Sequence, residues 1–421
     1  MKWFKELQHK HRQGKGVFQF LRFIGPGILV TVGFIDPGNW ATNIDAGSSY
    51  GYQLLWVVTL STIMLILLQH NAAHLGIVTG KCLSESATAH IRPRYARPIL
   101  STAMLAAVAT AFAELLGGAI ALQILFKLPI IIGTIIILLI TIFFTFSNAY
   151  SRIEKIIISF VSIIGFSFLF ELLLINTEWK TILHDSFVPS IPHGALYVIL
   201  GVLGSVVMPH NLYLHSEVIQ SRQWNLENKE IINRQLKYEF LDTLLSMGIG
   251  WLINSAMIVL AAAVFFANGK NVSDIAEASN ILTPFLGKFA SVIFALAFLF
   301  AGISSSITAA MSGGIIFAGM FSEAYNIKDV HSKAGALLTL IPATICIFFV
   351  TNTFQALVFS QVILSFQLPI TVILLVMLTS SRKVMGEYAN KGLTKGLLWV
   401  TAIFIAILNI WLFIETIFNA P

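Results

Sequence analysis

Charged side chains are scarce in this 421-residue chain: Asp, Glu, Lys and Arg make up 11% of it, whereas hydrophobic residues make up 57%. A soluble globular domain carries about 25% charged residues, so this chain has too few charges to cover a water-facing surface of its size. The mean hydropathy of +0.83 agrees with that conclusion. The charges that are present lie between long apolar runs, which is typical of a multi-span membrane protein.

Cysteine is also nearly absent. Cys82 and Cys346 are the only two, with no C-x-x-C pattern, so we expect neither disulfides nor a thiolate metal site. The first 20 residues are basic and lack the apolar core and cleavage site of a signal peptide, so we expect the N-terminus to stay in the cytoplasm. His70 and His74 lie four apart without the glutamate of an HExxH pattern, and no nucleophile–base set is visible. An enzyme is not expected.

Apolar runs of about 20 residues predict eleven membrane spans. They lie near 22–48, 52–77, 98–123, 128–147, 155–175, 195–220, 238–266, 281–318, 335–351, 355–379 and 396–417. With the N-terminus inside, only four of the 26 basic residues fall on the outer side, namely Lys127, Lys180, Lys270 and Lys288. This asymmetry supports a cytoplasmic N-terminus and an extracellular C-terminus. It also explains the net charge of +6 without a nucleic-acid partner.

Two of the predicted spans are interrupted at matching places. The first contains Asp36-Pro37-Gly38-Asn39 and the sixth contains Met208-Pro209-His210-Asn211. Proline removes a backbone hydrogen bond, and a carboxylate at bilayer depth is costly, so such breaks persist only where protein or a polar cavity surrounds them. Each break lies in the first span of a set of five, and an odd number inverts the second set. Paired broken helices in inverted halves predict a secondary transporter of the LeuT type, with its site near the midplane.

The breaks offer a particular set of donor atoms. These are the Asp36 carboxylate, the Asn39 amide oxygen, the Met208 thioether and the backbone carbonyl of Ser205. One carboxylate with neutral donors suits a cation. Mg²⁺ and Ca²⁺ prefer oxygen-only shells, whereas a thioether favours softer ions. The combination therefore predicts a site for Mn²⁺, Fe²⁺ or similar ions.

Four segments resemble the signature segments of the Nramp family, which includes the bacterial MntH manganese transporters. They are FIDPGNWATNIDAGSSYGYQLLWV, LGIVTGKCLSE, VVMPHNLYLHS and SQVILSFQLP, and the likeness runs from about residue 20 to 415. The resemblance implies a LeuT fold and proton-coupled uptake of Mn²⁺ or Fe²⁺. It places the metal ligands at Asp36, Asn39, Met208 and the Ser205 carbonyl, and brings Gln361 close to the ion. It also associates His210 and His215 with proton and metal movement, although interhelical hydrogen bonding is an equal alternative for His215.

Two departures from the family pattern fall on the route thought to carry protons. Where family members have a span-three pattern like T-D-L-A-E, this chain has Thr110-Ala111-Phe112-Ala113-Glu114, so Ala111 replaces the aspartate and Glu114 remains. The start of span nine has no arginine, only Lys333. We therefore expect coupling that is weaker than usual, rerouted through Glu114 and the histidines, or absent.

The complete prediction is an all-α, LeuT-type protein of two inverted five-helix repeats plus an eleventh helix. Its segments are a cytoplasmic stretch (1–21), the first repeat (22–175), an outer connection (176–194), the second repeat (195–379), and the last span with the C-terminus (380–421). We expect a monomer in the plasma membrane, in contact with lipids, with transition-metal ions as transported substrate and no cofactor. Two alternatives stay open: a proton-uncoupled carrier of broader selectivity that includes Mg²⁺, and a channel-like cation conductor.

Overall fold

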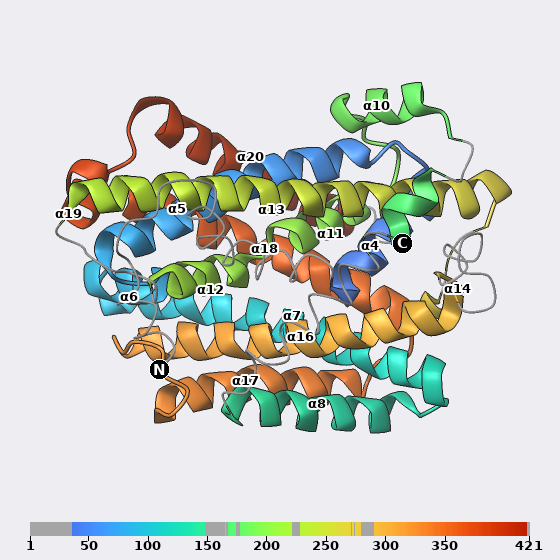
Figure 1. Ribbon diagram of the computed structural model, residues 1–421, viewed down its shortest axis with the longest axis horizontal. Helices are drawn as coiled ribbons and strands as arrows, with labels where there is room; N and C mark the ends of the chain where they lie inside the picture. Colours follow the sequence, from blue (N-terminus) through green and yellow to red (C-terminus); the bar gives the residue numbers. More distant parts are fainter. Residues whose placement is uncertain are drawn as a thin grey trace, which may run out of the picture.

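The computed structural model describes residues 36–147, 165, 167–173, 177–220, 228–270, 272, 274–278 and 290–418. Within these ranges the regular structure is entirely helical, with no strand. The long helices lie roughly side by side and cross one another along the length of the molecule (Figure 1). The fold is therefore a helix bundle, as the sequence predicts.

Nine helices in the described ranges are long and apolar enough to cross a membrane. They are α5 (Leu55–Thr79), α7 (Pro93–Phe126), α8 (Ile130–Ser147), the pair α11 (Leu196–Val207) and α12 (Pro209–Gln220), α13 (Lys229–Val264), α16 (Ala290–Met320), α17 (Val330–Ile347), α18 (Thr353–Thr379) and α20 (Gly392–Phe418). Each overlaps one predicted span. Most of predicted spans one and five lies outside the described residues, so the total of eleven stays a prediction.

Shorter helices complete the structure. They are α4 (Pro37–Tyr50), α6 (Leu83–His90), α10 (Trp179–Phe187), α14 (Ile275–Ala278), α19 (Arg382–Met385) and the 3-10 turns η1 (Phe266–Asn268) and η4 (Gly386–Tyr388). α4 overlaps predicted span one, whereas the other elements are shorter than the runs of about 20 apolar residues that predict a span. The outer connection predicted at 176–194 thus contains a helix, α10.

Local sequence explains where several helices begin and end. α7 starts at Pro93, which needs no N–H donor in the first turn. Asn352 caps α18 through its side chain, which accepts a hydrogen bond from the N–H of Gln355 at 3.0 Å. α5 ends at Gly80, whose φ of 70° is the left-handed conformation that favours glycine. These local signals determine where the helices begin and end, which packing alone would not determine.

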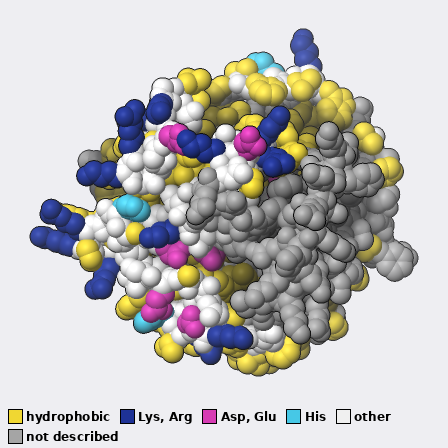
Figure 2. Space-filling view, turned by 60° about the vertical axis from the view of Figure 1, so that its left-hand side comes forward, with side chains coloured by type: hydrophobic (Ala, Val, Ile, Leu, Met, Phe, Trp, Pro, Cys, Tyr) yellow, Lys and Arg dark blue, Asp and Glu magenta, His cyan; other side chains and the backbone are white. Residues whose placement is uncertain are grey.

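One end of the molecule carries most of the described basic residues. Figure 2 shows this end, with many Lys and Arg side chains and fewer acidic ones. The helix ends gathered there include the end of α5, the start of α13 and the short helix α19 (Figure 1). We call it the basic end. Among the described residues, Lys127, Lys180 and Lys270 belong to the opposite end, as the predicted topology requires.

The core joins the first break to the centre of the bundle. Trp40 of α4 is 1% exposed and packs edge-on against Phe168 and Phe294, with ring centroids 5.5 and 5.1 Å apart. α7 and α16 approach closely at Gly302, where a Cβ would lie 2.8 Å from the carbonyl oxygen of Glu114. Small residues allow such backbone contact between membrane helices. The close packing therefore holds both α4 and α7 against α16.

Candidate metal-transport site

The first break is a helix N-terminus inside the bundle. Asp36 has an extended backbone and caps α4, because its Oδ1 accepts a hydrogen bond from the N–H of Asn39 at 2.6 Å. Pro37 occupies the first helical position, where a missing N–H costs nothing. Asp36 is 1% exposed and Asn39 is fully buried. The sequence Asp-Pro-Gly-Asn therefore starts the helix α4 deep in the protein.

The second break is a helix C-terminus followed directly by a new helix. α11 ends at Val207, and Met208 adopts a φ of 36°, which is uncommon for a residue other than glycine. α12 then starts at Pro209. Because Pro209 has no N–H, the carbonyl of Ser205 lacks the donor that a continuous helix would supply four residues later. The break thus leaves that carbonyl able to bind an ion.

A hydrogen-bond chain joins the two breaks. The Ser205 hydroxyl donates to the Asn39 side-chain oxygen at 3.1 Å and lies 3.0 Å from the hydroxyl of Thr42. Met208, beside the second break, is 1% exposed, and its sulfur accepts a hydrogen bond from the Asn211 amide at 3.2 Å. Residues from two distant segments thus meet at one place. The structure brings Asn39 and Ser205 together. Asp36 is at the first break with Asn39, and Met208 is at the second break with Ser205.

Gln361 reaches the first break from α18. A side chain at position 38 would collide with the Gln361 amide group, so Gly38 leaves the space that this amide occupies. The Gln361 nitrogen donates to the Ser360 hydroxyl at 3.0 Å, and among the described residues its oxygen has no hydrogen-bond partner. Gln361 is therefore placed beside the break with an acceptor to spare. By contrast, Gln367 bonds Thr102 of α7 at 3.3 Å.

Glu114 lies in the middle of α7 and is fully buried. Neither of its carboxylate oxygens has a hydrogen-bond partner in the described part of the chain. Its charge interacts with that of Asp36, and α7 contacts the break through Gly117, where a Cβ would collide with Pro37. Ala111, one turn before Glu114, is buried in an apolar cluster. Glu114 is thus the acidic side chain that α7 presents near the site.

The two histidines of α12 have different partners. His210 Nδ1 lies 3.0 Å from the hydroxyl of Thr110 on α7. His215 Nδ1 lies 2.6 Å from the side-chain oxygen of Gln69 on α5. Both rings are almost completely buried. Hydrogen bonds between helices are therefore present at both positions.

Sequence reasoning missed a polar extension of the site. Asn43 donates to the Asn39 oxygen at 3.0 Å and to the Asn254 oxygen of α13 at 2.9 Å. Asn254 is separated from Asn43 by more than 200 residues, and an asparagine in an apolar span signals only that some partner must exist. Asn43 lies one turn after Asn39 on α4. This spacing is the one sequence signal that could have identified Asn43 as part of the site.

A cavity of about 410 Å³ lies near the C-terminal end of α4. Its lining includes the Asp45 side chain with Tyr197, Asn352 and Gln355. Asp45 is nine residues beyond Asp36, or about 14 Å along the helix. The C-terminal end of α4 therefore borders a polar cavity with an acidic side chain in its lining.

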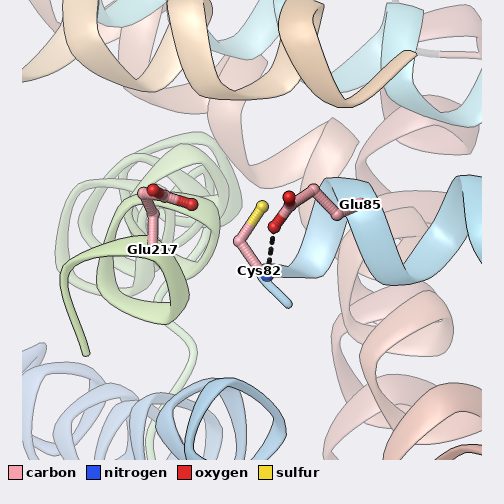
Figure 3. Close-up of side chains that lie close together, drawn as sticks. All are labelled: Cys82, Glu85 and Glu217. Atoms are coloured by element: carbon pink, nitrogen blue, oxygen red, sulfur yellow. Dashed lines mark hydrogen bonds between the residues drawn. The ribbon is translucent and has the colours of Figure 1, made fainter. Parts of the chain in front are cut away.

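Cys82, Glu85 and Glu217 form a second group of side chains able to bind metal, at the basic end (Figure 3). Their ligand atoms lie within 4.8 Å of one another. The N–H of Cys82 donates to Glu85 at 2.8 Å, which caps α6. Burial, with the two nearby carboxylates, raises the pKa of the Cys82 thiol, so it is protonated at neutral pH. Helix capping accounts for Cys82 and Glu85, and no sequence pattern indicates that Glu217 lies beside them.

Comparisons with known proteins place this architecture in a family. A sequence model described as natural resistance-associated macrophage protein-like, or Nramp, matches residues 27–415. The chain belongs to the Nramp family. A protein named divalent metal cation transporter MntH from Listeria welshimeri is 40% identical over 406 residues, covering 94% of this chain and 90% of the relative. A protein of the same name from Nostoc is 39% identical, with 95% and 92% coverage.

Solved structures agree with this assignment. The Eremococcus coleocola manganese transporter, crystallised with an aromatic bis-isothiourea compound, superposes with a TM-score of 0.80 at 28% identity, covering 94% of this chain and 87% of that one. A nucleobase-cation-symport-1 family transporter shares the fold with a TM-score of 0.61 at 16% identity, covering 91% of each chain. The predicted LeuT-type fold and the Nramp resemblance are confirmed. The chain is a multi-pass membrane transporter, and this family is not a class of enzymes.

Proposed function

We propose that this Nramp protein imports Mn²⁺, and Fe²⁺ or similar transition-metal ions, across the plasma membrane by alternating access. The observation that carries the proposal is the meeting of the two breaks through the Asn39–Ser205 hydrogen bond. Around it lie the Asp36 carboxylate, the Met208 thioether and the Gln361 amide. The names of the relatives and of the Eremococcus coleocola structure agree with a divalent, and in one case a manganese, substrate.

The donor set explains why a transition metal is favoured over Mg²⁺. Asp36 supplies one negative charge, while Asn39, Gln361 and the Ser205 carbonyl supply neutral oxygen atoms. Mg²⁺ sheds its water ligands reluctantly and demands oxygen in near-octahedral geometry. The Met208 sulfur is a soft ligand that rewards Mn²⁺, Fe²⁺ and softer ions. A carrier of broader selectivity that accepts Mg²⁺ is therefore the weaker alternative.

Burial of the site favours a carrier over a channel. Asp36, Asn39, Ser205, Met208 and Gln361 are each at most 1% exposed. A channel requires a continuous path for the ion, whereas a carrier closes its site on both sides during each cycle. We infer that the ion enters from the end bearing the Asp45 cavity and leaves at the basic end, which we assign to the cytoplasm on the positive-inside rule.

We further infer that proton coupling is weaker than the resemblance implies. Ala111 offers no carboxylate beside the site, and the first turn of α17 has Lys333 but no arginine. Glu114, His210 and His215 are the titratable groups left near the ion. We expect metal uptake with fewer protons carried per ion than in a fully coupled symporter.

Transport by purified protein in vesicles tests both parts. Vesicles containing a metal-sensing dye and a pH dye would be given Mn²⁺ or Mg²⁺, with and without a pH gradient. We expect saturable Mn²⁺ uptake, little Mg²⁺ uptake and sub-stoichiometric acidification. Ohmic, non-saturable currents would support a channel instead. Acidification that is stoichiometric with Mn²⁺ uptake would contradict the weak proton coupling. The proposal that Mn²⁺ is the substrate would still stand.

A further inference from the structure

Three titratable side chains from three helices form a row between the second break and the basic end. His215 Nε2 of α12 lies 3.9 Å from Glu239 Oε1 of α13. The other oxygen of the same carboxylate, Oε2, lies 2.6 Å from Nδ1 of His70 on α5. One carboxylate therefore faces a different imidazole with each of its oxygens.

Burial decreases along the row. The His215 side chain is fully buried and that of Glu239 is 4% exposed, whereas that of His70 is 27% exposed. His215 is seven residues beyond Met208, about 10 Å along α12. Its distance from the break and the rising exposure show a direction, from beside the transport site towards the surface of the bundle. An ionisable residue within a membrane span is costly, and chains of Asp, Glu and His residues serve as proton relays in pumps and transporters.

The hydrogen bond to Gln69 indicates which ring nitrogen of His215 carries the hydrogen. Gln69 offers an oxygen to His215 Nδ1, so that nitrogen carries the hydrogen and the lone pair of the neutral ring is on Nε2, the side of Glu239. Thr243 donates to Glu239 Oε1 at 2.7 Å. A separation of 3.9 Å is longer than a hydrogen bond and within reach of one bridging water or a small side-chain shift.

Other titratable groups lie around Glu239 on its own helix, α13, and on α5 and α12. Asp242, on the same helix, adds a second negative charge. From α5, His70 makes the direct contact, and the His74 ring stacks near it with centroids 6.2 Å apart. From α12 the facing group is His215. Two acidic groups therefore share this region with three histidines, and the cluster can hold a variable number of protons.

A purely structural role explains only part of the row. The His70–Glu239 contact alone would hold α5 against α13. It does not require a third titratable group, fully buried, with a ring nitrogen directed at the same carboxylate. The row also lies away from α7 and α17, where Ala111 and the absence of arginine remove the expected proton groups.

We propose that His215, Glu239 and His70 conduct protons from the transport site to the cytoplasm between α5, α12 and α13. This inference rests on the proposed transport function and adds a route to it. A proton on His215 Nε2 passes to Glu239 Oε1, and rotation of the neutral carboxyl group turns that proton towards His70. The carboxyl group then gives the proton to Nδ1 of the neutral His70 ring, whose hydrogen is on Nε2 in that state. His70 then releases a proton to water from Nε2. Each transfer moves one proton and returns its donor to the starting form once the carboxyl and ring reorient.

The test is Glu239→Gln in the full-length protein, with metal and pH dyes in the same vesicles. Glutamine keeps the size of the side chain and its hydrogen bonds to His70 and Thr243, but it cannot accept a proton. We expect proton flux to fall about tenfold or more. This minimum is smaller than the loss of about 100-fold that removal of a positioned proton-transfer group commonly causes. Mn²⁺ uptake down a steep concentration gradient should change by less than about twofold, and its pH dependence should flatten.

Glu230→Gln is the matched control, because Glu230 is on the same helix and exposed. It should behave as wild type. His70→Gln provides a second variant at the exposed end of the row, with His90→Gln as its control, since His90 bonds only its own helix in the described contacts. His70→Gln should also reduce proton flux more than Mn²⁺ uptake.

The possible outcomes separate this inference from the proposed function. Wild-type proton flux in Glu239→Gln and in His70→Gln overturns the path, and so does a parallel loss of proton flux and Mn²⁺ uptake. Mn²⁺ uptake without any proton flux in the wild type also overturns the path, while the metal transport stands. Absence of Mn²⁺ uptake in the wild type contradicts the proposed function itself.

Discussion

The two helix breaks meet at one place but are built in opposite ways. The first is a helix N-terminus, where the Asp36 carboxylate caps α4. The second is a helix C-terminus, where Met208 with its positive φ ends α11 and Pro209 begins α12. A helix N-terminus carries a partial positive charge and a C-terminus a partial negative one. The first break would therefore repel a cation without its carboxylate, whereas the second attracts one through its backbone.

The difference divides the work of recognition between the breaks. In the proposed site, the first break would supply charge and hard oxygen atoms, which attract any small cation. The second would supply the thioether, which distinguishes soft ions from hard ones. Neither half is a metal site alone. Since the halves are on different helices, a movement of α4 against α11 would take the site apart and release the ion.

The largest expected effect is from Asp36→Asn. Asparagine is as good a helix cap as aspartate, so α4 should still form. The charge that offsets the positive helix end is lost, and we expect Mn²⁺ uptake to fall by more than about 100-fold, beyond the losses seen when groups that only support a metal ligand are removed. The measurement is initial Mn²⁺ uptake in vesicles at equal protein content.

Asp329→Asn is its control. Asp329 also precedes a helix, α17, but it is exposed and makes no capping hydrogen bond through its side chain. This variant should transport as wild type does. Transport by Asp36→Asn at a wild-type rate would show that the Asp36 carboxylate is not a metal ligand. It would also contradict the proposal that the first break contributes the negative charge of the site.

Met208→Leu should change selectivity more than rate. Leucine has a similar volume, so packing changes little, while the sulfur is lost. We expect Mn²⁺ uptake to fall about tenfold, the lower end of losses caused by weakening a metal site, and Cd²⁺ uptake to fall further. Mg²⁺ and Ca²⁺ should begin to compete. Competition assays with each ion measure this effect.

Met257→Leu controls for the sulfur itself, because Met257 is equally buried but is on α13 in an apolar cluster. Its selectivity should match the wild type. An unchanged order of ions in Met208→Leu would show that the second break contributes only backbone atoms.

The sequence was sufficient to locate the two breaks, because Pro, Gly and Asp are conspicuous within apolar spans, and the metal-binding role of their donor atoms stays a prediction. It predicted all nine membrane-crossing helices that the described part of the chain contains. It did not reveal contacts between helices that are distant in sequence. Asn43 pairs with Asn254, and His70 with Glu239, and in neither case does spacing along the chain indicate a partner. Side-chain pairing depends on helix rotation and crossing, which hydropathy does not determine.

Gly38→Ala should act through Gln361. The added methyl group would occupy the space of the Gln361 amide, so it should push that amide away from the site. We expect a loss of about 1 kcal/mol in apparent Mn²⁺ affinity, the usual contribution of one polar contact. Gln361→Ala should cause a similar loss, and the double variant should be no worse than either single one, because both changes remove the same contact.

Gly248→Ala is the control, since a Cβ added to this α13 glycine has no atom within 4 Å. It should leave affinity unchanged. Additive losses in the double variant would show that Gly38 serves the break by its own flexibility and not by making room for Gln361.

Ser205→Ala should have the smallest effect. The substitution keeps the backbone carbonyl and removes only the hydroxyl that joins the breaks through Asn39 and Thr42. We expect a change in Mn²⁺ affinity below about 1 kcal/mol, the net value of a typical hydrogen bond. Ser186→Ala, which removes a hydroxyl bonded only to its own helix in the described contacts, is the matched control. A loss as large as that of Asp36→Asn would mean that the hydroxyl, and not the carbonyl, is the donor from the second break, so both breaks would then contribute side chains alone.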